Sequence, residues 1–129
     1  WSSIIGLQFE NLVLSNRDAI LRKLDLQHDD IICDNPFFQK KSAKAPGCQI
    51  DYLIQSNTST LYACEMKFSR NEISSSIIQQ MQNKLSNLTK PKGISCLPVL
   101  IHVNGVSDHV VDSNYLFKII NFSDLLTEN

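Results

Sequence analysis

The chain has 129 residues, of which 43% are hydrophobic and 19% are charged, so it can fold as one compact domain and is not intrinsically disordered. Its 12 Lys and Arg residues nearly balance its 13 Asp and Glu residues, and the formal charge of −1 disfavours a free-standing nucleic-acid binder, which is usually basic. No apolar stretch approaches the ~18 residues of a membrane helix, so we expect no membrane association.

Four cysteines occur in the chain, and none of them forms a CxxC pair: Cys33, Cys48, Cys64 and Cys96. Three of the four lie in apolar, strand-like runs, and buried core thiols are the simplest interpretation for all four. We therefore expect a reduced, cytoplasmic protein without disulfide bonds.

Residues 2 to about 25 carry apolar side chains at helical spacing, which predicts a first helix. Glu10 lies at the margin of its apolar face, between Leu7 and Leu14. A carboxylate at that position is out of pattern and marks Glu10 as a candidate functional residue.

Three strand-like runs follow this helix, at residues 30–39, 49–55 and 61–68. Pro36 lies within the first run, and it indicates an edge strand or a bulge because proline cannot donate to a ladder. Residues 56–60 are Ser, Asn and Thr, which favour a turn, so we expect the second and third strands to form a hairpin.

Apolar residues then recur every three or four positions from Ile73 to Leu88, which predicts a second helix. Ser69 and Glu72 have the spacing of a capping box and predict that this helix begins there. Two further strands are predicted at residues 97–103 and 115–120. The order helix, three strands, helix, two strands favours an α/β fold with a mixed sheet flanked by helices.

The third predicted strand carries two charges in an apolar setting. Its residues alternate between one face, Tyr62, Cys64, Met66 and Phe68, and a second face, Leu61, Ala63, Glu65 and Lys67. Burying an unpaired charge costs several kcal/mol, so Glu65 and Lys67 need compensating partners.

The second predicted strand repeats the anomaly. Its two faces are expected to hold Ile50, Tyr52 and Ile54 on one side, and Asp51 and Leu53 on the other. In the hairpin, Asp51 and Glu65 lie near the same end, and a bound Mg²⁺ or Mn²⁺ would relieve their repulsion because such hard ions take carboxylate oxygens. Lys67 projects to the same side, where it can steady a phosphate oxygen or an attacking water. The alternative is a buried Asp–Lys or Glu–Lys ion pair at the end of the sheet.

The segments GCQIDYLI (residues 47–54) and CEMKFS (64–69) resemble the core of the PD-(D/E)XK superfamily. They resemble more closely the restriction-endonuclease-like domain at the C-terminal end of certain prokaryotic AAA-type ATPases. The segment GLQFE (6–10) is similar to the start of that domain, whereas Ile50 stands where the superfamily has a proline. Because the chain begins at Trp1 and not at a methionine, we expect one nuclease-like domain of 129 residues from a longer ATPase chain.

The resemblance implies that Asp51 and Glu65 bind Mg²⁺ or Mn²⁺, that Glu10 joins them, and that Lys67 assists the attacking water. Asp51, Glu65 and Lys67 are thus the candidate catalytic residues. The implied activity is that of a metal-dependent DNA endonuclease, which hydrolyses phosphodiester bonds. The alternative is a non-cleaving module that binds DNA or a protein partner for the ATPase. The near-neutral charge favours the module, and the complete carboxylate set favours the nuclease.

Other polar residues are candidates for supporting roles. Some superfamily members add a Gln or Lys from the second helix, and Gln80 and Lys84 match that place; the alternative is a solvated helix face. Candidate contacts to DNA phosphates, with an ordinary solvated loop as the alternative, are Lys40, Lys41, Lys44 and Arg70. A basic groove around the two carboxylates would favour the nuclease over the module.

Overall fold

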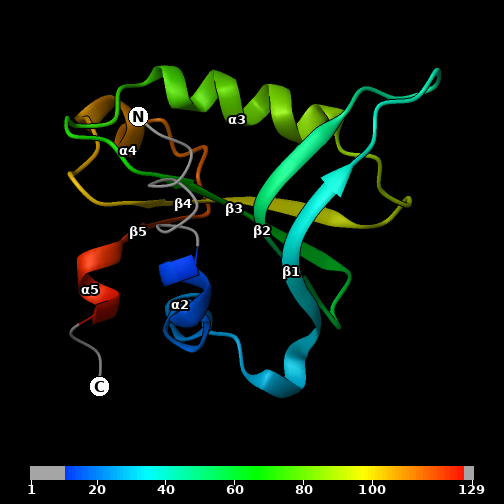
Figure 1. The fold of residues 1–129 in the computed structure, drawn as a ribbon, viewed down its shortest axis with the longest axis horizontal. Coiled ribbons are helices and arrows are strands. Elements are labelled where there is room, and N and C mark those ends of the chain that lie inside the picture. Colours follow the sequence, from blue (N-terminus) through cyan, green and yellow to red (C-terminus); the bar gives the residue numbers. More distant parts are fainter. Residues whose placement is uncertain (1–10, 127–129) are drawn as a thin grey trace.

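A five-stranded mixed sheet organises residues 11–126, the part of the chain that the computed structural model describes (Figure 1). Its strands lie in sequence order: β1 (Ile31–Gln39), β2 (Cys48–Ser56), β3 (Thr60–Lys67), β4 (Ser95–His102) and β5 (Lys118–Asn121). β1, β2 and β3 are antiparallel to one another, whereas β3, β4 and β5 are parallel. The α/β fold with a mixed sheet flanked by helices is thereby confirmed.

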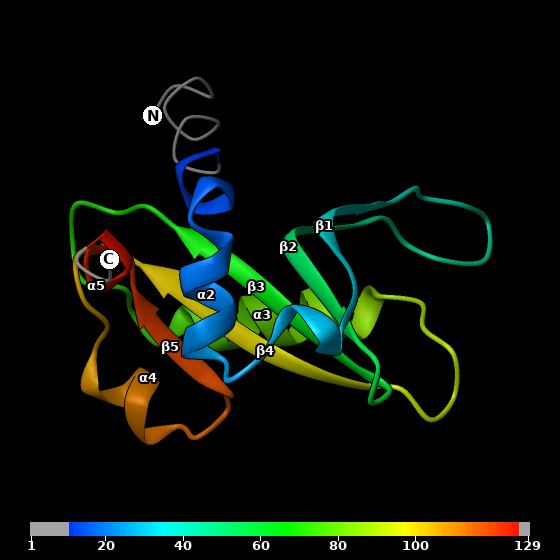
Figure 2. The same ribbon diagram turned by 90° about the horizontal axis from the view of Figure 1, so that it is seen from below.

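Helices cover both faces of this sheet (Figures 1 and 2). They are α2 (Arg17–Lys23), α3 (Ser76–Asn87), α4 (Asp108–Asp112) and α5 (Phe122–Leu126), with the 3₁₀ turn η1 (His28–Asp30) before β1. Buried residues of α2 and α5 form one core cluster with β2, β3 and β4, and buried residues of α3 and α4 form another on the opposite face. Among residues 11–126, no helix is long and apolar enough to cross a membrane.

The first predicted helix is interrupted within the described residues. Residues 11–15 are helical and α2 begins at Arg17, with a turn at Asn16 between them. The Asn16 side-chain amide donates a hydrogen bond to the Leu12 carbonyl at 2.8 Å, which is the local bonding by which asparagine competes with helix geometry. Glu10 lies outside the described residues.

The second predicted helix begins later than its capping pattern indicated. α3 begins at Ser76, so the capping-box prediction for Ser69 and Glu72 is wrong. The Ile73 N–H donates to the Gly105 carbonyl at 3.0 Å, and the Ile73 carbonyl accepts from the Ser107 N–H at 2.9 Å. Because these backbone groups are bonded to a distant loop, the chain cannot become helical at Ile73.

β1 lies at the edge of the sheet and its pairing is irregular near Pro36, so the expectation of an edge strand or bulge is confirmed. Asn35 pairs with Leu53 and Phe37 pairs with Ile50, so two steps along β1 match three steps along β2. The extra residue of β2 therefore falls between Ile50 and Leu53, which is where Asp51 lies.

This irregularity changes which face Ile50 occupies. Ile50 packs with Ala63 and Leu88 on the α3 side of the sheet, whereas Tyr52 packs in the cluster on the α2 side. The prediction that Ile50 shares a face with Tyr52 is therefore wrong, because simple alternation fails across a bulge. Ile50 consequently provides an apolar wall on the side where α3 packs.

The turn between β2 and β3 provides a stability test. Ser59 has a φ of 59°, in the left-handed region that non-glycine residues avoid. We expect Ser59→Gly to raise the free energy of unfolding by about 1 kcal/mol, measured by urea denaturation. Ser95→Gly is the matched control, since Ser95 begins β4 and glycine in a strand is destabilising. A loss of stability in Ser59→Gly would contradict the strain at this turn.

Candidate functional site

Asp51 lies where the pairing of β2 and β3 stops. The last pair of that ladder is Tyr52 with Cys64, and Asp51 and Glu65 are the next residues along each strand. The half-buried Asp51 carboxylate accepts a hydrogen bond from the Met66 N–H at 2.9 Å. The Asp51 side chain thus satisfies the Met66 N–H beyond the last pair of the β2–β3 ladder, and this bond fixes the Asp51 carboxylate beside β3.

Glu65 is 2% exposed and is the most unusual charged group of the site. Its Oε2 atom accepts a hydrogen bond from the Lys84 Nζ at 2.9 Å, whereas its buried Oε1 atom accepts none from any described residue. Burial raises the pKa of Glu65 to about 7, the negative charge of Asp51 contributes to this rise, and Lys84 opposes it. An unsatisfied buried oxygen is costly, so this carboxylate favours a proton or a cation as an additional partner.

Lys84 does not lie on a solvated helix face. Its ammonium group reaches from α3 to Glu65, and its side chain is 31% exposed. Its backbone carbonyl accepts a hydrogen bond from the Cys48 Sγ at 3.4 Å, which ties this turn of α3 to β2. The structure therefore brings Lys84 to the predicted carboxylates, as the supporting-residue interpretation expected, and an ion pair at the sheet end is part of the arrangement.

Lys67 and Gln80 line a separate pocket next to the carboxylates. Lys67 ends β3 and is half-buried, and its position two residues after Glu65 puts it on the same face of the strand. Together with Glu72 and Ile77 it lines a surface pocket of about 350 Å³ at the first turns of α3, which Gln80 also lines. The pocket offers space for a ligand beside Lys67.

The remaining candidates lie in exposed loops. Lys40, Lys41 and Lys44 lie in the loop that joins β1 to β2, and Arg70 lies in the loop between β3 and α3. These loops flank opposite ends of α3 (Figure 1). Glu10, the expected third carboxylate, is not among the described residues.

Two described carboxylates, Asp51 and Glu65, lie at this site. Within residues 11–126, no group of three or more His, Cys, Asp or Glu side chains could hold a metal ion. Asp51 and Glu65 offer carboxylate oxygens, the ligand type that Mg²⁺ and Mn²⁺ prefer. Mg²⁺ is commonly held by one or two carboxylates with water and substrate phosphate completing its shell. The residues present therefore fit such an ion, and the unpartnered Glu65 Oε1 is the observation that favours it.

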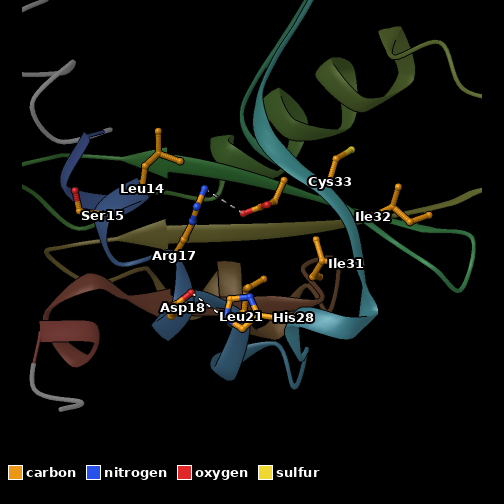
Figure 3. A pocket seen from close by; sticks show the side chains of 10 residues that line it. Leu14, Ser15, Arg17, Asp18, Leu21, His28, Ile31, Ile32 and Cys33 are labelled. Carbon is orange, nitrogen blue, oxygen red and sulfur yellow. Dashed lines mark ion pairs between the residues drawn. The ribbon is translucent and has the colours of Figure 1, made fainter.

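A cavity of about 590 Å³ lies on the other side of the sheet, between α2 and β1 (Figure 3). Its charged side chains pair with one another: Arg17 lies 3.9 Å from Asp34, and His28 lies 3.3 Å from Asp18. The Tyr52 hydroxyl also donates to Asp34, at 2.5 Å, and burial together with this bond raises the pKa of Tyr52. Because its ionisable groups already have partners, the cavity is a weaker candidate for catalysis than the Asp51–Glu65 pair.

No protein-family model matches this chain, and no match is found among curated proteins. The resemblance to PD-(D/E)XK nucleases stays a prediction that depends on the residues themselves. The bond between Asp51 and the Met66 N–H could not be predicted from the sequence, because it depends on where the pairing of β2 with β3 ends.

The raised pKa of Glu65 predicts how stability depends on pH in metal-free buffer. A carboxyl whose pKa rises from 4.5 to about 7 on folding destabilises the folded state as pH increases through that range, because the unfolded chain loses its proton first. We expect wild type to lose about 3 kcal/mol relative to Glu65→Gln between these pH values, at roughly 1.4 kcal/mol per pKa unit.

The comparison with Glu65→Gln is needed because buried His102 acts in the opposite sense. Burial lowers the pKa of His102, so its deprotonation stabilises the fold as pH rises. Urea denaturation at several pH values, with EDTA present, measures the difference between the two proteins. A difference that stays constant across this pH range would show that Glu65 remains an ordinary ionised partner of Lys84.

Proposed function

We propose that this protein is a metal-dependent nuclease that hydrolyses phosphodiester bonds in DNA, with Asp51 and Glu65 holding Mg²⁺ or Mn²⁺. One observation carries the proposal: a buried carboxylate oxygen of Glu65 has no hydrogen-bond partner among residues 11–126, and the half-buried carboxylate of Asp51 lies close enough to raise the pKa of Glu65. Two adjacent carboxylates repel each other, and a divalent cation would offset both charges. Glu10 is proposed to add a third carboxylate, from the residues before the described part.

When bound, such a cation supplies a Lewis acid for the scissile phosphate and lowers the pKa of a water molecule. The chain's own groups have separate tasks. The Met66 N–H orients Asp51, and Lys84 holds Glu65 in one rotamer while it limits the local negative charge. Neither task requires the side chains to rearrange before substrate arrives.

Lys67 is the residue proposed to contact the reacting groups. It lines the pocket at the start of α3, where its ammonium group can bind a non-bridging phosphate oxygen and orient the attacking water. In the reaction, water oxygen bonds to phosphorus as the phosphorus–oxygen bond to the leaving strand breaks. The attacking water releases its proton to the solvent, and the leaving oxygen takes up a proton from the solvent. Gln80 on the same pocket wall is proposed to help position the phosphate.

The second candidate, proposed from the resemblance alone, is a non-cleaving DNA- or protein-binding module of an AAA-type ATPase. The observation that favours it is the 2.9 Å ion pair between Lys84 and Glu65, which already provides Glu65 with one charged partner. If that pair is structural, the two carboxylates stabilise the fold and no cation is needed. The two candidates differ in whether Asp51 is required for a chemical step.

A cleavage assay tests the proposal. Labelled single-stranded, duplex and branched DNA is incubated with Mg²⁺ or Mn²⁺ and wild-type protein, Asp51→Asn, or Lys67→Ala. We expect each substitution to slow cleavage by roughly 100-fold or more, because each removes a group that acts on the reacting phosphate. Lys118→Ala, at an exposed position of β5, is the matched control and is expected to keep the wild-type rate.

Equal rates for wild type and Asp51→Asn would indicate a contaminating nuclease and would refute the proposed site. DNA that wild type binds but never cuts, in either metal, would favour the non-cleaving module.

A further inference from the structure

The charges of this protein are separated along the chain. Residues 35–50 contain no Asp or Glu, and their charged residues are Lys40, Lys41 and Lys44. Residues 73–107 also contain no Asp or Glu, and their charged residues are Lys84, Lys90 and Lys92. The formal charge of −1 is therefore the sum of two segments whose charged residues are all lysines and of an acidic rest of the chain.

Gln39 fastens these two basic segments together. Its side-chain amide donates to the carbonyls of Asn87 and Pro46, each at 2.8 Å, and its Oε1 accepts from the Thr89 N–H at 2.8 Å. Lys40 follows Gln39 and Lys90 follows Thr89, so both lysine-bearing loops begin at the residues that these hydrogen bonds join. Figures 1 and 2 show the β1–β2 loop and the loop after α3 at the same end of the molecule.

An exposed aromatic ring lies beside these lysines. Phe38 is 71% exposed, although its neighbour Phe37 packs against the core on the α3 side. Because successive strand residues face opposite sides, Phe38 projects from the other face of β1. A single exposed apolar residue needs no explanation by itself, but an open ring next to clustered lysines matches the surfaces on which unpaired bases stack.

We propose that Phe38 with Lys40, Lys41, Lys44, Lys90 and Lys92, here called the hairpin platform, binds single-stranded nucleic acid. The lysines bind successive phosphates, and the Phe38 ring stacks on a base. Duplex DNA fits less well because its bases are already stacked inside and offer no face to Phe38. An anionic membrane also attracts lysines, but the platform is a strand end and two loops, without the amphipathic helix that lies in a membrane surface.

The platform adjoins the proposed catalytic centre through α3. Asn87 at the end of this helix holds Gln39, and Lys84 one turn earlier holds Glu65. One turn of α3 therefore joins the platform to the ion pair at Glu65. The inference deepens the proposed nuclease by naming single-stranded nucleic acid as its substrate class, and it rests on that proposal only for cleavage.

Fluorescence anisotropy with labelled poly-dT and with a duplex, in low salt and EDTA, tests the platform without cleavage. Wild type is expected to prefer poly-dT, and Phe38→Ala to weaken that binding by about tenfold. Ile32→Ala is the matched control, since Ile32 is also an exposed apolar residue of β1. The double substitution Lys90→Glu and Lys92→Glu is expected to weaken binding and its salt dependence, whereas Lys118→Glu on β5 is not.

Absence of binding to poly-dT would overturn the platform. So would duplex binding as tight as poly-dT binding that Phe38→Ala does not weaken. Binding to phosphatidylserine vesicles but not to poly-dT, in a separate vesicle assay, would also overturn it. Binding in EDTA separates this inference from the proposed function, because the platform needs no metal ion whereas the proposed cleavage does. Failure of metal-dependent cleavage with poly-dT binding retained would refute the nuclease and keep the platform. Metal-dependent cleavage by wild type, with poly-dT binding unaffected by the platform substitutions, would refute the platform and keep the nuclease.

Discussion

The burial of the Glu65 carboxylate is the constraint on which the proposed site depends. This group is 2% exposed on a central strand, with apolar neighbours on its own face of the sheet. Lys84 compensates one of its oxygens, and the other has no partner among the described residues. A buried charge that is only half compensated is expensive to retain, and sites of this kind are more typical of function than of stability.

The surrounding structure positions this carboxylate. The register shift between β1 and β2 falls at Asp51, which is also where the ladder of β2 with β3 ends, and the Met66 N–H bonds the Asp51 side chain. The late beginning of α3, which follows from the bonds of Ile73 to residues 105–107, leaves a loop whose residues line the pocket beside Lys67. The two departures from simple sequence patterns thus both lie next to the candidate site, as expected where function competes with regular structure.

Much of this arrangement could be predicted from the sequence. Alternation on β3 gave Tyr62, Cys64 and Met66 one face, and the structure buries all three in one cluster. The edge position of Pro36 and the mixed sheet also follow from local patterns. The face of Ile50 could not be predicted, because a bulge depends on pairing with another strand. The clamp of Gln39 on Asn87 and Thr89 joins distant residues through side-chain bonds that leave no periodic signal.

The hairpin platform and the carboxylate pair give the proposed function two separable parts, one for holding a strand and one for chemistry. The central claim concerns the second part: Asp51 and Glu65 bind a divalent cation in place of a proton. Calorimetric titration of Mn²⁺ at pH 7 into wild type and Glu65→Gln measures this binding. We expect saturable binding by wild type and none by Glu65→Gln. No binding to wild type at millimolar Mn²⁺, or equal binding to Glu65→Gln, would contradict it.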